Sequence, residues 1–116
     1  MSLRWSAAAR VVQPTLWVLA VGINEYQNSR YDLNYATGDA QGFVRAVSAR
    51  GEGLFSEVEA TLVSDTDATR VRIISAMEEI AGRAAPEDVF MFFYAGHGIA
   101  QDPDGDGEAD FFFVPT

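Results

Sequence analysis

Two uninterrupted apolar runs, each stopped by glycine, limit the folds open to this 116-residue chain more than any other feature. The first covers residues 16–21 and ends at Gly22, and the second covers residues 89–95 and ends at Gly96. An apolar run without alternation predicts a strand that is covered on both faces, as in a parallel sheet. Strands of that kind need helices on both sides, so we expect an α/β protein.

The segments between these runs carry the periodicity of helices. Apolar residues spaced by four, three and four predict one helical face, made of Ala36, Ala40, Phe43 and Val47. The glycine-rich segment 51–53 should end that helix. A second helix is expected after the cap-rich segment 65–69. Its apolar face is predicted to comprise Val71, Ile74, Met77 and Ala81, with Ile73 and Ile80 beside it.

Two shorter stretches complete the predicted sheet. Residues 57–62 alternate between polar and apolar, which predicts a half-covered strand, and residues 111–114 form a further short apolar strand. Because crossover connections are right-handed, this order predicts an open, mainly parallel sheet with helices on both faces, an incomplete three-layer α/β/α arrangement. Residues 1–14 are expected to be a lead-in and residues 15–116 one domain. The side of the sheet beside residues 89–95 is expected to need cover from a further C-terminal segment or a partner.

The charge balance restricts the partners. The net charge is −9, and the eight cationic residues are all arginines scattered along the chain. Nucleic acid and anionic membrane surfaces both bind proteins through clusters of Lys and Arg, which this chain lacks, so neither is an expected partner. The apolar stretch 16–21 is too short to span a bilayer, and Gln13 and Pro14 interrupt any signal-peptide core. We therefore expect a soluble, cytoplasmic protein.

The only histidine, His97, lies between Gly96 and Gly98 directly after the second apolar run. Open α/β sheets place their sites at the carboxyl ends of strands, and imidazole is the usual proton carrier near neutral pH. His97 is therefore a candidate general acid and base, and a loop histidine without a chemical task is the open alternative. The chain has no cysteine, so it can offer no thiol nucleophile, no disulfide and no Cys-type zinc site.

The segment 102–110 is rich in carboxylates. It reads D-x-D-x-D-G-x-x-D and offers calcium the hard oxygen ligands that this cation prefers, from Asp102, Asp104, Asp106 and Asp110. It is not a complete EF-hand loop, because the twelfth position is Phe113 rather than a bidentate glutamate. A solvated hairpin, in which Asp and Gly serve only turn geometry, is the open alternative to a calcium site.

Three segments resemble the caspase-like cysteine peptidases, and within them the bacterial metacaspase (orthocaspase) branch. Residues 17–26 resemble the first strand and its loop, residues 33–40 the entry to the first helix, and residues 88–98 the strand that ends at the catalytic histidine. The Tyr-Ala-Gly-His-Gly sequence of residues 94–98 is the most specific of these elements. The resemblance extends over residues 16–116 and matches the histidine-bearing, large-subunit region of the family.

The resemblance implies a role for three residues. His97 would act as general acid and base for a cysteine nucleophile that is not present in this chain. The backbone N–H of Gly98 would help to form the oxyanion hole. Asp39 would line the primary specificity pocket and favour Arg or Lys before the cut. For Asp39, an acid that only stabilises the helix N-terminus through the dipole remains the alternative.

The implied function is that of a cysteine-type endopeptidase acting on proteins or peptides, with no cofactor required for the chemistry. The cysteine-bearing remainder of the domain would be joined in cis or present as a cleaved partner, and this chain alone should be inactive. The alternative is a non-catalytic caspase-like module for regulation or interaction, with calcium binding as an open question. A nucleotide-binding domain is disfavoured, because no glycine-rich turn leads from a strand into a helix.

Overall fold

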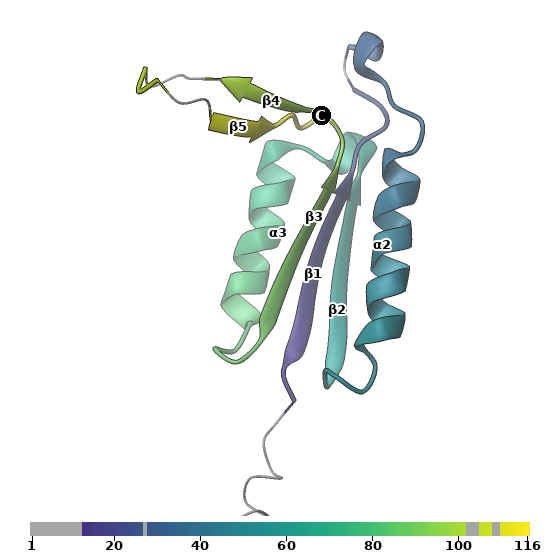
Figure 1. The fold of residues 1–116 in the computed structure, drawn as a ribbon, viewed down its shortest axis with the longest axis vertical. Helices are drawn as coiled ribbons and strands as arrows, with labels where there is room; N and C mark the ends of the chain where they lie inside the picture. The colour runs from purple at the N-terminus through teal and green to yellow at the C-terminus, as the bar shows by residue number, and fades with distance from the viewer. Residues whose placement is uncertain (1–12, 27, 102–104, 108–109) are drawn as a thin grey trace, which may run out of the picture.

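A computed structural model describes residues 13–26, 28–101, 105–107 and 110–116 (Figure 1). Three parallel strands, β1 (Thr15–Gly22), β2 (Glu57–Ser64) and β3 (Val89–Ala95), form a sheet in the order β2-β1-β3. Helix α2 (Ala36–Gly51) and helix α3 (Arg70–Arg83) cover opposite faces of this sheet (Figure 1). The predicted α/β fold with helices on both faces is confirmed. No helix of the described part of the chain is long and apolar enough to cross a membrane.

The first apolar run becomes the central strand β1. Each residue of β1 pairs in parallel with β2, and residues 16–22 also pair with β3, so that Leu16 lies beside both Val58 and Val89. Leu16, Leu19 and Val21 are almost completely buried. The expectation of cover on both faces is confirmed for this strand, because both neighbours and both helices enclose it.

Helix α2 packs on the sheet through the predicted face. Ala36 and Ala40 are buried, and the ring of Phe43 stacks on Phe93 of β3 with centroids 4.4 Å apart. Gly22 lets the start of the helix approach the end of β1, since a Cβ there would lie 2.7 Å from the Ala36 carbonyl oxygen. This close approach places the N-terminus of α2 at the carboxyl edge of the sheet.

The predicted apolar face of α3 is confirmed at Met77 and is wrong at Val71 and Ile74. Val71 is 77% exposed and Ile74 42% exposed, whereas the buried residues of the helix are Ala76 and Ile80. Ile73 and Met77 pack against the core beside them. The exposed pair, Val71 and Ile74, and the buried pair, Ala76 and Ile80, both have helical spacing. Alanine is only weakly apolar, so Ala76 did not mark the buried face in the sequence. The sequence pattern therefore could not decide which of two overlapping faces meets the sheet.

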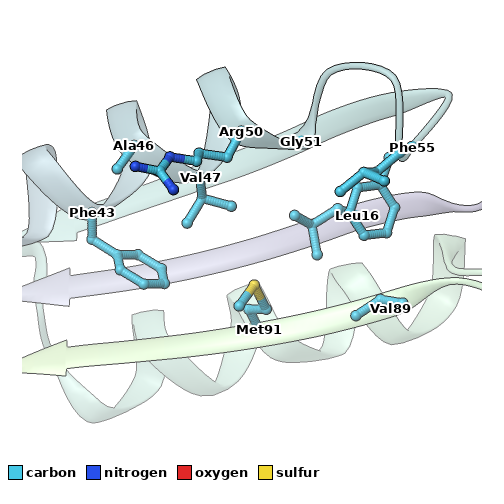
Figure 2. Close-up of a pocket in the computed structure, with 10 residues that line it drawn as sticks. Leu16, Phe43, Ala46, Val47, Arg50, Gly51, Phe55, Val89 and Met91 are labelled. Atoms are coloured by element: carbon cyan, nitrogen blue, oxygen red, sulfur yellow. The ribbon is translucent and has the colours of Figure 1, made fainter.

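Strand β3 is only partly covered. Within the described residues it pairs with β1 alone, and the first three residues, Val89, Phe90 and Met91, are 39–45% exposed. A cavity of about 450 Å³ lies on the α2 side, where side chains from β3, β1 and α2 converge (Figure 2). Its lining includes Leu16, Phe43, Val47, Val89 and Met91. Phe90 lines a second, apolar cavity of about 300 Å³ on the α3 side. The start of β3 is therefore poorly covered by the described residues, as expected for the side of the sheet that needs a further segment or a partner.

The last predicted strand does not join the parallel sheet. Strand β5 (Asp110–Phe113) pairs antiparallel with β4 (Gly98–Gln101), and this hairpin leans away from the three-stranded sheet (Figure 1). The chain then returns to the carboxyl edge, where Thr116 N–H donates to the Ala68 carbonyl at 3.0 Å. Two short 3₁₀ helices, η1 (Ser29–Tyr31) and η2 (Asp65–Asp67), lie in the loops after β1 and β2.

Candidate functional site

His97 follows β3 at the carboxyl edge of the sheet and is half-buried. The Nε2 atom of its ring lies 2.7 Å from the backbone carbonyl oxygen of Tyr31 in η1. A carbonyl oxygen only accepts, so Nε2 carries the proton, and in the neutral ring the lone pair is on Nδ1. The predicted placement of the imidazole at this edge is confirmed, and Nδ1 is the atom that can accept a proton.

Aromatic rings border the imidazole. The centroid of the Tyr26 ring lies 5.1 Å from that of His97 at an interplanar angle of 56°, and the Tyr31 ring lies 5.7 Å away at 70°. Distances and tilts of this kind are the favourable ones for aromatic pairs. The ring of His97 is therefore oriented by contacts with the loop after β1 as well as by its own hydrogen bond.

Asn24 fixes the loop that carries these tyrosines to the start of α2. Its Oδ1 accepts from the N–H groups of Ala36 and Thr37, at 2.8 and 3.2 Å, and its Nδ2 donates to the Thr37 hydroxyl. The residue at the N-cap position, Tyr35, makes no side-chain cap bond, so Asn24 satisfies the first helical N–H groups from a distance in sequence. Capping patterns use residues next to the start of a helix, so the sequence did not reveal that Asn24 caps α2.

Asp65 joins the same loop to the end of β2. Its Oδ1 accepts from the backbone N–H groups of Asn24 and Glu25, at 2.9 and 3.1 Å. Asp65 adopts a φ of 50°, a conformation that costs free energy for a residue with a side chain. Thr116 donates its hydroxyl proton to the Asp65 carbonyl, so three segments of the chain meet at this residue.

Two tyrosine hydroxyls contact the backbone of His97. The Tyr26 hydroxyl accepts from the His97 N–H at 2.8 Å. The Tyr94 hydroxyl lies 2.8 Å from the His97 carbonyl oxygen and 2.9 Å from that of Val114, and these two acceptors share its single proton. Burial, with a smaller contribution from Tyr26, raises the pKa of Tyr94 well above its ordinary value, so this hydroxyl keeps its proton. Sequence reasoning did not identify either tyrosine as part of the site.

The structure brings Asp39 to a cavity beside His97. This cavity of about 350 Å³ is lined by Leu33, Asn34, Tyr35, Ala36, Asp39, Tyr94, Ala95 and Gly96. Asp39 is the one charged residue in that set, and it lies in the first turn of α2. A carboxylate at that place both faces a pocket and stabilises the positive end of the helix, so both interpretations of Asp39 fit its position.

Gly98 begins β4 and pairs with Phe113 of β5. The Val114 N–H donates to the His97 carbonyl at 3.0 Å, so the end of the hairpin is fastened beside the imidazole. The structure thus places Gly98 next to the candidate base, and its oxyanion role stays a prediction.

The predicted calcium loop lies largely outside the described residues. This applies to Asp102 and Asp104 and to the side chain of Asp110, while Asp106 is exposed. Among the residues that the structure does describe, no group of three or more His, Asp or Glu side chains is arranged to hold a metal ion. Calcium binding at this loop stays a prediction.

The comparison with known proteins agrees with this geometry. No curated protein matches the chain. The sequence model of the caspase domain family, Peptidase C14, matches residues 15–114, a range that includes the sheet, both helices and the candidate site. The chain therefore belongs to the caspase domain family of peptidases.

Proposed function

We propose that this chain is the histidine-bearing part of a cysteine endopeptidase of the caspase class, and within it of the metacaspase branch. The observation that carries the proposal is the hydrogen bond from His97 Nε2 to the Tyr31 carbonyl, at the carboxyl edge of the sheet, where open α/β folds place their sites. That bond makes Nδ1 the proton acceptor. The chain has no cysteine, so the thiol must come from another polypeptide segment.

In the proposed reaction His97 Nδ1 takes the proton of the external thiol, and the thiolate attacks the scissile carbonyl carbon. The carbon–nitrogen bond of the substrate then breaks, and the imidazolium returns the proton to the leaving amine. This leaves a thioester. A water molecule, deprotonated by the same imidazole, attacks its carbonyl carbon, the carbon–sulfur bond breaks, and the imidazolium returns the proton to the thiolate. The Tyr31 carbonyl, 2.7 Å from Nε2, holds the ring in the orientation that leaves Nδ1 for the thiol proton.

The oxyanion that forms during attack needs a donor close to His97. In this proposal the backbone N–H of Gly98, the next residue, supplies one such donor. A glycine suits this position because it has no side chain to obstruct the approach of the substrate carbonyl.

Asp39 is proposed to select Arg or Lys before the cut. The carboxylate is the single charge among the residues lining the 350 Å³ cavity, which extends to Gly96, the neighbour of His97. An arginine side chain in this cavity would form a charge-assisted and bidentate contact with Asp39. The position of Asp39 supports the preference, and a substrate assay has to test it.

The partner that brings the cysteine is proposed to pack along β3. This strand has a free edge among the described residues, and apolar cavities flank it on both faces. A further strand with its own helices, joined in cis or present as a cleaved partner, would cover Val89, Phe90 and Met91.

The proposal is tested with peptide amides that carry Arg, Lys or Asp before the scissile bond. The chain alone should hydrolyse none of them. The assembly that contains the cysteine segment should cleave the Arg and Lys substrates, and Asp39→Asn should reduce this preference by about tenfold or more, since a charge-assisted hydrogen bond contributes about 1.5–3 kcal/mol. Asp67→Asn, an exposed acid in η2, is the matched control. Cleavage after Asp would overturn the role of Asp39.

A non-catalytic caspase-like module is the second candidate, and the absence of cysteine from the chain favours it. The two candidates differ in the same assay. If every polypeptide that binds the chain also lacks a cysteine near His97, and no assembly hydrolyses the peptides, the module interpretation replaces the peptidase.

A further inference from the structure

Both backbone polar groups of His97 contact a tyrosine hydroxyl, and its carbonyl accepts from the Val114 N–H as well. The N–H donates to the hydroxyl of Tyr26, and the carbonyl accepts from the hydroxyl of Tyr94, each at 2.8 Å. Tyr94 is three residues away on β3, whereas Tyr26 is 71 residues away in the loop after β1. The tyrosine pair (Tyr26 and Tyr94) thus joins two distant parts of the chain at the residue that carries the imidazole.

The room for this pair comes from Gly96. A Cβ at this position would lie 2.8 Å from the Tyr26 hydroxyl and 2.8 Å from the Tyr94 hydroxyl. Gly96 does not have a positive φ, so its backbone conformation alone does not require glycine. The glycine before His97 is therefore needed for the close approach of the two hydroxyls.

The tyrosine pair also affects where the imidazole points. Tyr26 contacts the imidazole with its ring as well as the backbone with its hydroxyl. With the His97 backbone held in this place after β3, the imidazole reaches the Tyr31 carbonyl at 2.7 Å. A shift of about 1 Å in such a group is enough to reduce a reaction rate by about a hundredfold.

We infer that Tyr26 and Tyr94 are positioning residues for His97. Their hydroxyls fix its backbone, which keeps Nε2 on the Tyr31 carbonyl and leaves Nδ1 open to accept a proton. The catalytic meaning of this arrangement rests on the proposed function, whereas the ordering of the imidazole does not. Tyr94 extends the arrangement to the hairpin through its bond to the Val114 carbonyl.

The single histidine makes the inference testable by NMR, because all imidazole signals belong to His97. The ring C–H order parameter should be near the value of rigid groups, about 0.85, and should fall below about 0.6 in Tyr26→Phe and in Tyr94→Phe. The Nε2 proton should exchange with water about fivefold faster in both variants, the effect of losing about 1 kcal/mol of hydrogen-bond free energy.

Tyr35→Phe is the matched control. It removes the same hydroxyl from a ring that is 77% exposed, so the imidazole should keep its wild-type order. The inference is overturned if the two variants keep the wild-type order and exchange, if the control loses them equally, or if the wild-type ring is already mobile. Thermal unfolding shows whether each variant folds, and if Tyr94→Phe does not, Tyr26→Phe decides alone.

This experiment is independent of the peptidase assay, because the chain is measured without a thiol. A mobile ring would overturn the positioning role and leave the proposed function standing. A rigid ring in a chain whose assembly shows no hydrolysis would overturn the proposed function alone. In an active assembly, Tyr26→Phe should lower kcat and leave KM unchanged, because Tyr26, unlike Tyr94, does not line the cavity proposed for the substrate side chain.

Discussion

At the residue scale, the glycine before His97 shows how tightly this edge of the sheet is packed. Gly96→Ala would place a methyl group 2.8 Å from two hydroxyls, so one or both must move. We expect a loss of about 1–3 kcal/mol in the free energy of unfolding, the usual effect of overpacking. Denaturant titration measures it.

Gly82→Ala is the matched control for that substitution. Gly82 lies in α3 with no neighbouring atom within 4 Å of an added Cβ, so alanine should stabilise the protein by about 0.5–1 kcal/mol. Equal effects of the two substitutions would contradict the close packing around Gly96.

Asp88 lies at the end of the sheet opposite His97, and its hydrogen bonds should make the stability of the protein depend on pH. The Trp17 indole N–H and the backbone N–H groups of Ala85 and Thr15 donate to its carboxylate and hold the pKa of Asp88 below the ordinary value. The contribution of Asp88 to the free energy of unfolding is complete above about pH 3.9, the pKa of an aspartate in the unfolded chain. It is lost as the pH falls through the lower pKa of the folded chain.

Asp88→Asn should therefore lower the melting temperature at neutral pH, because the amide cannot accept from all three donors. The difference from the wild type should shrink as the pH falls below about 4. Glu87→Gln changes an exposed neighbouring acid and is the control. A gap between wild type and Asp88→Asn that stays constant down to pH 2 would contradict the account.

At the element scale, the sequence predicted where the strands and helices lie better than which of their faces are buried. Residues 16–22 became the central strand, and the face of α2 that includes Ala40 and Phe43 was predicted correctly. The face of α3 was predicted only in part, because two overlapping sets of apolar residues have the same helical period. The exposure of Phe90 on β3 agrees with the expectation that this side of the sheet needs further cover.

Substitutions on the buried face and on the exposed face of α3 should differ in their effect on the free energy of unfolding. Ile80 is 6% exposed in the core, so Ile80→Ala should cost about 2–5 kcal/mol in the free energy of unfolding. Val71 is 77% exposed, and Val71→Ala should change this free energy by less than about 0.5 kcal/mol. Chemical denaturation of both variants measures the contrast. A larger loss for Val71→Ala would mean that the opposite face of the helix meets the sheet.

At the scale of the whole molecule, the candidate site depends on contacts that no local pattern contains. His97 and Asp39 could be proposed from motifs, but the bond from His97 to Tyr31 joins residues 66 positions apart. The hydrogen bonds of Asn24 and Asp65 likewise join segments that are far apart in the sequence. Such contacts follow from the crossover topology, which brings the carboxyl ends of β1, β2 and β3 to one edge.

The most direct test of the account is the effect of His97→Ala on peptide cleavage by the assembly that contains the cysteine segment. The account predicts hydrolysis after Arg or Lys by the wild type and a loss of about 10²–10⁴-fold in kcat in the variant, the usual contribution of a positioned acid and base. The binding of the cysteine segment to the chain should be unchanged. Cleavage by His97→Ala at the wild-type rate would contradict the central role given to this histidine.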